Sequence, residues 1–374
     1  MEPAASLDVP VLPARGPEDL LAYAGHALGR LPAGSLLLIT LAAGRLRAVV
    51  RVDLPEPSPA PAPPDPAEAV EWARAVAGVC RRDAEADAVL ALALPAGPAP
   101  GLDAPSCAAA LTAALAVAGR PLAGAWTAAG GRARPWSGRD RGQDHDVDPR
   151  STPLSLHLMA RGSVWDRAAA PEPVPRAGPV PRGRRAASWR APAADDDAAR
   201  RVWLSQWESV LAGERGAARP VPAEGTAPVS GPEEHPSADA AVLGAPLTLP
   251  SWRDALVLHA AVRPGVPPPE PAERERLLTA GSEQAPPWGR LDRLRAGLRR
   301  LVPDAPPPAA AQALALAGWV GWARGQGSDA AAHLAAAAEL APDDPFVTLM
   351  RRVVDTGCVA GWAAHPDTAW RPGA

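Results

Sequence analysis

The sequence predicts an α/β fold, with a mixed sheet and flanking helices in an N-terminal domain and an all-helical C-terminal domain after it. Early segments alternate between apolar runs of strand length and helical periodicity, whereas later segments show helical periodicity alone. A stretch rich in proline and arginine separates the two patterns. We therefore expect an α/β domain at 1–166, a linker at 167–194, a helical domain at 195–362 with a loose segment at 213–238, and a disordered tail at 363–374.

The first predicted helix begins at Pro17, since proline is favoured at the first helical position and Glu18 and Asp19 put acids in the first turn. Gly29 follows the last apolar residue of the pattern and is suited to cap the helix. Pro32 prevents the helix from continuing. These signals define both ends of the element.

Two strands are predicted next, joined by a short link around Gly44 that favours an antiparallel hairpin. Leu36–Leu41 is uniformly apolar, as in a strand covered on both faces, and Arg45–Leu54 alternates between apolar and charged residues. The remaining elements of this domain are a helix that follows Asp65, a strand at 88–94, a helix at 104–118, and two strands at 122–127 and 132–136 that flank Gly130-Gly131 as a second hairpin.

The C-terminal domain is predicted to be a set of helices that pack through tryptophan side chains. The chain has 13 Trp but one Phe and one Tyr, and Trp203 and Trp207 lie about one helical turn apart. We expect the tryptophans to supply the bulk that an alanine-rich core lacks. The predicted helices are 195–212, 252–262, 273–278, 288–301, 309–324, 329–340 and 346–355.

The composition excludes several enzyme classes. The chain contains neither Lys nor Asn, so it has no Schiff-base or P-loop lysine and no Cys–His–Asn catalytic set. The sequence also lacks G-x-S-x-G, H-E-x-x-H and Cys-x-x-Cys motifs. We therefore predict no catalytic residues, no metal ligands and no cofactor.

Two motifs resemble ligand sites, and each has a simpler explanation. Asp144–Asp148 carries acids at alternate positions like a calcium loop, but Pro149 and Ser155 stand where that loop needs Gly and Glu. We favour a solvated acidic loop. Gly325–Ala330 matches G-x-G-x-x-A, but it follows a helix where a dinucleotide site needs a strand, which favours a tight turn between two helices.

Charge and cysteine content indicate the partners and the compartment. The net charge of −3 offers no general attraction to nucleic acid or acidic lipid. The arginines of Pro173–Arg190 could bind RNA or form a polyproline II ligand, and we favour a charged linker instead. Cys80, Cys107 and Cys358 are far apart, which does not indicate disulfides. We expect a cytoplasmic protein with no membrane partner, and we do not expect a nucleic-acid partner.

The candidate functional surface lies on the second predicted strand. Alternation places Arg45, Arg47 and Arg51 on one face, about 7 Å apart where the spacing is two residues. Arginine suits carboxylate and phosphate groups, so this row is a candidate anion-binding surface. The alternative is a solvated sheet face in which Asp53 gives partial compensation of charge.

Short motifs along most of residues 12–362 resemble one protein family. They are Gly16–Leu21, Leu28-Gly29, Pro32, Ser35-Leu36, Arg51–Pro55, Arg253–Leu256 and Gly325–Met350. On these motifs the chain resembles the actinobacterial "domain of unknown function 4192" family, whose name records that no activity is assigned. The motif positions to which no role is attached are Gly29, Pro32, Ser35, Asp53, Arg253 and Asp254.

The chain departs from that family's pattern at Arg30-Leu31 and Ala33-Gly34, and Asp140–Pro149 lacks the cysteine that the family carries there. Residues 311–345 also resemble a single tetratricopeptide unit, which predicts a helical hairpin packed on its neighbours.

Two functions follow from these observations. The first, which we prefer, is a non-catalytic interaction protein whose helical hairpins offer a groove to a protein partner. The second is a small-molecule or anion-binding protein, or an enzyme, that uses the strand ends of the α/β domain. A broad apolar patch on the C-terminal helices would favour the first function, and a pocket with converging Arg and Asp would favour the second.

Overall fold

A computed structural model describes residues 13–55, 66–96, 105–160, 163, 165, 173–179, 183–213, 238–267, 269–365 and 367–370. The chain divides into two compact units whose main spans are Met1–Pro171 and Glu172–Pro372. The hydrophobic clusters of the described residues each lie within one unit, so each unit has a core of its own. The loose segment expected at 213–238 lies outside the described residues except at its two ends.

The N-terminal unit contains a mixed six-stranded sheet, as predicted. Its strands are β1 (Ser35–Ala42), β2 (Arg45–Asp53), β3 (Ala88–Leu94), β4 (Leu122–Ala129), β5 (Arg132–Pro135) and β6 (His145–Asp146), in the spatial order β2-β1-β3-β4-β5-β6. β3 and β4 are parallel and the other neighbouring pairs are antiparallel. Both predicted hairpins, β1–β2 and β4–β5, are confirmed.

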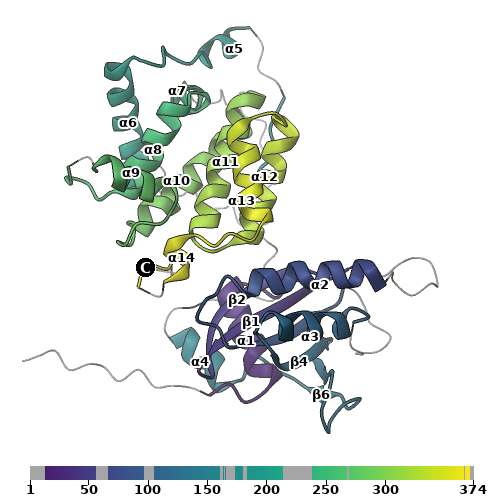
Figure 1. Ribbon diagram of the computed structural model, residues 1–374. Coiled ribbons are helices and arrows are strands. Elements are labelled where there is room, and N and C mark those ends of the chain that lie inside the picture. Colours follow the sequence, from purple (N-terminus) through teal and green to yellow (C-terminus); the bar gives the residue numbers. More distant parts are fainter. Residues whose placement is uncertain are drawn as a thin grey trace, which may run out of the picture. The chain divides into compact units, whose positions relative to one another are not determined.

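Helices cover both faces of this sheet (Figure 1). α1 (Pro17–Leu28) packs on one face with Leu37 and Ile39, which are odd-numbered residues of β1. α2 (Pro66–Cys80) and α3 (Ala108–Val117) pack on the other face with the even-numbered Leu36 and Leu38. The uniformly apolar sequence of β1 is explained by this double coverage.

α4 (Pro153–Ala160) and β6 were not predicted from the sequence. The helix is almost uniformly apolar and lacks the periodicity that identifies an amphipathic helix. Tertiary contacts hold it against α1: the ring of His26 makes hydrogen bonds to Ser155 Oγ (3.0 Å) and Ser163 Oγ (2.9 Å). β6 pairs with β5 inside the segment expected to be an acidic loop.

The C-terminal unit is helical, as predicted. Its helices are α5 (Arg184–Ser188), α6 (Asp197–Ala212), α7 (Ala238–Gly244), α8 (Pro250–Ala261), α9 (Pro271–Leu278), α10 (Trp288–Leu301), α11 (Pro307–Ala323), α12 (Gly327–Leu340), α13 (Pro345–Asp355) and α14 (Gly361–Ala364), with a 3-10 turn at Ala245–Thr248. α11 is buried from Ala309 to Ala323, and α12 packs along it as the predicted helical hairpin. The turn at Gly325 joins these two helices, as the sequence indicates.

Tryptophan side chains form two groups in the core of this unit. Trp203, Trp207 and Trp252 make tilted or edge-to-face contacts with ring centroids 5.4–6.5 Å apart. Trp288 and Trp319 make similar contacts with Trp362 at 5.8 and 6.3 Å. The predicted packing role of tryptophan is therefore confirmed for these six residues.

Parts of the expected linker and tail pack against the helical unit. Arg299 Nη2 donates a hydrogen bond to the Pro173 carbonyl (2.8 Å), and Trp252 Nε1 donates one to Ala194 (3.1 Å). Near the C-terminus, Trp288 Nε1 donates to the carbonyl of Thr368, a residue that is itself buried. These contacts attach to the helical unit some residues of the segments that composition assigns to a linker and a tail. Composition alone cannot identify such long-range hydrogen bonds.

No helix in the described part of the chain is long and apolar enough to cross a membrane.

Candidate functional site

The three arginines of the candidate anion surface do not share a face of the sheet. Between positions 46 and 49 the register shifts, because β2 advances by three residues while β1 advances by two. This β-bulge reverses the alternation of β2, so Leu46 and Val49 both pack in the core on the α1 side. Arg45 and Arg47 consequently lie on the α2 side, and Arg51 lies on the α1 side. The prediction of one shared face is wrong.

Arg47 is held by acidic side chains. Its Nε atom lies 3.0 Å from Asp83 Oδ2 and its Nη1 atom 2.5 Å from Glu85 Oε2. Asp83 also accepts a hydrogen bond from the Thr40 hydroxyl (2.8 Å). Burial alone would raise the pKa of Asp83, but the hydrogen bonds from Arg47 and Thr40 outweigh it and lower that pKa.

Arg51 holds two of the family-motif positions together. Its Nε atom donates to Ser35 Oγ (2.8 Å), and its Nη2 atom lies 2.5 Å from Asp53 Oδ1. Gly29 ends α1 with a positive φ of 73°, which favours glycine, and Pro32 is buried between α1 and β1. These four motif positions therefore shape the connection from α1 into the hairpin.

The acidic segment at 144–148 is tied to the sheet by arginine. Asp144 forms ion pairs with Arg132 and with Arg134, whose Nε atom lies 2.5 Å from Oδ1. The hydrogen bond from Arg134 and the charge of Arg132 lower the pKa of Asp144. Among the described residues, no group of three or more His, Cys, Asp or Glu side chains is arranged to hold a metal ion.

The buried cysteines are not thiolate nucleophiles at neutral pH. Burial raises the pKa of the Cys80 thiol to about 11, and burial also raises the pKa of Cys107. Because the thiolate is the reactive form, both side chains act as apolar core residues.

In the helical unit, the motif residue Arg253 joins three helices. Its Nε and Nη2 atoms lie 3.1 and 3.0 Å from Asp254 Oδ1, and its Nη1 atom donates to Gln312 Oε1 on α11 (3.2 Å). Gln312 Nε2 in turn donates to Asp344 Oδ2 (2.7 Å), just before α13. The Arg253 guanidinium also lies over the Phe346 ring, 4.0 Å from its centroid. We call the chain Asp254–Arg253–Gln312–Asp344 the Arg253 relay.

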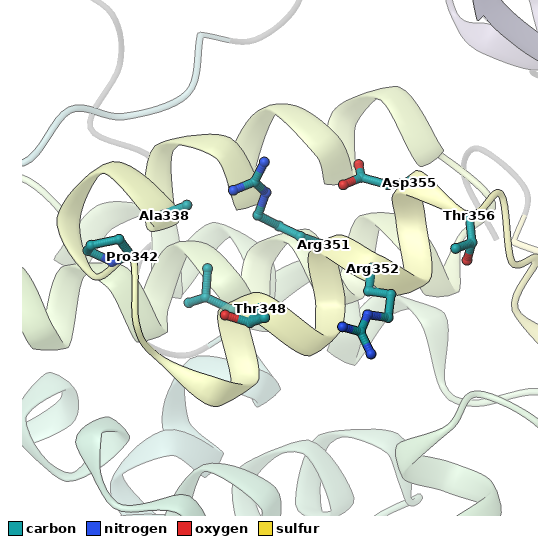
Figure 2. Close-up of a pocket in the computed structure, with 8 residues that line it drawn as sticks. Ala338, Pro342, Thr348, Arg351, Arg352, Asp355 and Thr356 are labelled. Atoms are coloured by element: carbon teal, nitrogen blue, oxygen red, sulfur yellow. The ribbon is translucent and has the colours of Figure 1, made fainter. Parts of the chain in front are cut away.

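A groove of about 420 Å³ runs between the C-terminal part of α12 and one face of α13. We call it the α12–α13 groove (Figure 2). The buried Val347 and the half-buried Ala338 give it an apolar floor. Its lining residues are Ala338, Pro342, Val347, Thr348, Arg351, Arg352, Asp355 and Thr356, and six of the eight are exposed.

The arginines of the groove differ from those in the core of the helical unit. Arg290 is ion-paired with Glu208 at 2.6 Å, and Arg295 with Asp329 at 2.8 Å. No hydrogen bond or ion pair joins the Arg351 or Arg352 side chain to another described residue. In Figure 2 the two guanidinium groups point in different directions, Arg351 towards α12 and Arg352 away from it. The groove therefore offers two positive charges to different parts of a ligand.

The sequence did not identify this groove. Its basic residues sit on the solvent side of an amphipathic helix, where arginine is common and usually only keeps a surface hydrated. A weak signal exists in the adjacent pair Arg351-Arg352, since none of the six residues before it in α13 is acidic. That α12 lies alongside this pair follows only from the packing of the hairpin.

Comparison with known proteins gives a family but no activity. No curated protein and no solved structure matches the chain. The model of the family described as "Domain of unknown function (DUF4192)" matches residues 17–359. This range begins at the start of α1 and includes both the Arg253 relay and the α12–α13 groove. The chain therefore belongs to the DUF4192 family.

Proposed function

We propose that this protein is a non-catalytic interaction protein and that its α12–α13 groove binds an extended acidic segment of a partner protein. The observation that carries the proposal is the groove itself, with an apolar floor beside Arg351 and Arg352, two arginines that pair with no described residue. Arginine binds carboxylates through bidentate hydrogen bonds, and for this reason we propose a partner segment that carries acidic side chains.

The shape of the groove favours a peptide over a small anion. Small-molecule sites usually enclose most of their ligand, whereas six of the eight lining residues here are exposed. The Arg351 and Arg352 guanidinium groups diverge, so one phosphate would not contact both. An extended segment with two spaced acidic side chains could reach both of them.

Charge around the groove defines how such a segment would lie. The lining has two arginines and one aspartate, Asp355, and all three belong to α13. On the α12 side, Glu339 and Asp343 are exposed next to the lining positions Ala338 and Pro342. The acids of the partner would therefore lie at the two arginines and away from Glu339, Asp343 and Asp355, because those carboxylates would repel them.

The α/β unit gives less support to the alternative of an anion-binding protein or enzyme. Its candidate arginines lie on different faces, and Arg47 and Arg51 already contact acidic side chains. We also propose that the protein acts in the cytoplasm. The free cysteines Cys80, Cys107 and Cys358 support this, since thiols persist in a reducing compartment.

Fluorescence anisotropy of the full chain with a labelled peptide tests the proposal. The probe is a fluorescein-labelled dodecapeptide that alternates glutamate with alanine, and its glutamine counterpart is the reference peptide. We expect the glutamate peptide to bind more tightly. Replacing both groove arginines (Arg351→Gln with Arg352→Gln) should raise the dissociation constant at least about tenfold, equivalent to about 1.4 kcal/mol.

The matched control removes the same charge elsewhere in the helical unit. Arg263 and Arg300 are exposed and do not line the groove, so Arg263→Gln with Arg300→Gln should leave the dissociation constant within about twofold. Equal binding of the glutamate and glutamine peptides, or equal losses in the two double variants, would contradict the proposal. The second outcome would mean that the peptide responds only to net charge.

A further inference from the structure

The position of the Arg253 relay suggests a role for a family motif that the proposed function does not use. Arg253 lies on α8, Gln312 on α11 and Asp344 at the start of α13, so hydrogen bonds connect three helices that are distant in the sequence. The Arg253 side chain is 11% exposed and Gln312 is 5% exposed. The middle of the relay is therefore largely buried, whereas the Asp254 side chain at one end is 43% exposed.

Gln312 is an unusual residue for its place in the helix. It belongs to the run from Ala309 to Ala323 that is buried throughout, and its neighbours in that run are apolar or glycine. A buried amide is costly unless both of its ends find partners. Here Oε1 accepts from Arg253 and Nε2 donates to Asp344, which fixes the orientation of the amide.

Asp344 connects the relay to the groove, because it bonds both to Gln312 and to the first turn of α13. Its Oδ1 atom accepts hydrogen bonds from the backbone N–H groups of Phe346 and Val347, both at 3.0 Å, and so caps α13. Val347 forms the floor of the groove, and Arg351 follows one turn later on the same helix. The direction in which α13 leaves its cap therefore sets where the groove arginines stand.

We propose that Gln312 and Asp344 are positioning residues for the α12–α13 groove and that Arg253 orients the Gln312 amide towards Asp344. The inference rests on the proposed function only for what the groove binds. One part of the proposal holds without any ligand: Arg253, Gln312 and Asp344 act as one hydrogen-bonded unit with a fixed donor–acceptor direction.

Exchanging one donor–acceptor pair tests that claim. Gln312→Glu alone places two carboxylates against each other, and Asp344→Asn alone leaves one donor facing another donor. The double variant restores complementarity, because the glutamate can accept from Arg253 and from the new asparagine amide, while the asparagine Oδ1 can still cap α13. The double variant therefore restores the hydrogen bond between positions 312 and 344 that each single change breaks.

The first readout is hydrogen exchange of the Phe346 and Val347 amides in the full chain without ligand. Each single variant should exchange at least about tenfold faster than the parent, and the double variant should return to within about threefold. If the two substitutions acted independently, their increases in exchange rate would multiply. A double variant whose amides exchange faster than those of both single variants would therefore contradict the proposal that the side chains act as one unit.

The second readout is anisotropy with the glutamate dodecapeptide. We expect weaker binding for each single variant and recovery for the double variant, which links the relay to the groove. A double variant that recovers the slow amide exchange of the parent but not its peptide binding would refute the positioning role. Rescue of exchange in a protein whose parent binds no peptide would support the relay and reject the proposed function instead.

Discussion

At the residue scale, the ion pair between Arg47 and Asp83 determines how the edge strand β2 is held. Arg47 comes from the bulged part of β2, and Asp83 follows α2. The side chains of Arg47 and Asp83 are 29% and 16% exposed, so solvent screens the pair only in part. Thr40 on β1 joins the same carboxylate and extends the contact to a second strand.

We expect Arg47→Gln to lower the free energy of unfolding by about 1–2 kcal/mol, because Asp83 loses a charged hydrogen-bond partner. The pKa of Asp83 is lowered in the folded chain, so its contribution is present above the unfolded value near 3.9 and is lost as pH falls through the folded value. The difference in the free energy of unfolding between the variant and the parent should therefore shrink below about pH 4. Urea unfolding of both proteins at several pH values measures this difference.

The control for this prediction is Arg45→Gln, since Arg45 is exposed on the same strand and the same face. It should change the free energy of unfolding by less than about 0.5 kcal/mol. If both variants lose the same stability at pH 7, the ion pair does not stabilise the hairpin.

His333 is a buried histidine that the fold keeps neutral. Its Nδ1 atom lies 2.8 Å from the Asp329 carbonyl, and its Nε2 atom lies 2.5 Å from Arg299 Nη1. Arg299 can only donate, so Nε2 must accept and Nδ1 must carry the proton. Burial is the main cause that lowers the pKa of His333, and the charges of Arg295 and Arg299 act in the same direction against that of Asp329.

This tautomer predicts an acid-sensitive helical unit. The unfolded chain binds a proton near pH 6.5 and the folded chain only at lower pH, so stability should fall as pH drops below about 6.5. His333→Gln should flatten that part of the stability profile, whereas His365→Gln, at an exposed position, should keep the parent's slope. An unchanged slope in His333→Gln would show that His333 is not the source of the dependence.

At the scale of elements, the sequence predicted where helices and strands lie in the chain better than it predicted which way their side chains face. Signals such as Pro17 with Gly29 fixed α1 at both ends, since caps are local chemistry. The bulge in β2 escaped detection because Ala48, exposed in the structure, fits the alternating pattern as an inward apolar residue. The α12–α13 groove arises from how two helices pack, which no periodicity within either helix records.

The close approach of α11 and α12 is a testable feature of the hairpin. A Cβ atom added at Gly318 would meet Leu334 Cγ at 3.0 Å and the Ala330 carbonyl oxygen at 3.2 Å. Gly318→Ala would raise helix propensity by about 1 kcal/mol, but we expect the crowding to dominate and to lower the free energy of unfolding by about 1–2 kcal/mol. Thermal unfolding provides the measurement.

Gly327→Ala supplies the comparison, because Gly327 opens α12 and its added Cβ would meet no atom within 4 Å other than its chain neighbours and the backbone of its own helix. That change should be neutral or slightly stabilising. A Gly318→Ala protein that is more stable than the parent would mean that the two helices are not in close contact at this point.

At the scale of the whole molecule, two hydrogen bonds lead us to propose a domain boundary other than the one that the sequence predicts. The hydrogen bonds from Arg299 to Pro173 and from Trp252 to Ala194 attach part of the expected linker to the helical unit. We therefore propose that this unit begins near residue 172 and not at 195. Proline-rich composition indicated a linker because proline opposes regular structure, yet an irregular segment can still pack.

Two fragments distinguish these boundaries. The fragment 172–374 should unfold cooperatively, since its hydrophobic core draws only on residues of the helical unit. The fragment 195–374 lacks the Pro173 and Ala194 contacts, and we expect its melting temperature to be several degrees lower. Equal melting temperatures would favour the sequence-based boundary at 195.

Chemical-shift mapping tests whether the α12–α13 groove is the binding site without presuming where a ligand binds. The full chain, labelled with ¹⁵N, is titrated with the glutamate dodecapeptide. We predict that the backbone amides that shift most lie between Ala338 and Thr356, with Thr348, Arg351 and Arg352 among them. Shifts concentrated in β2 around Arg47, or no specific shifts at a saturating peptide concentration, would contradict it.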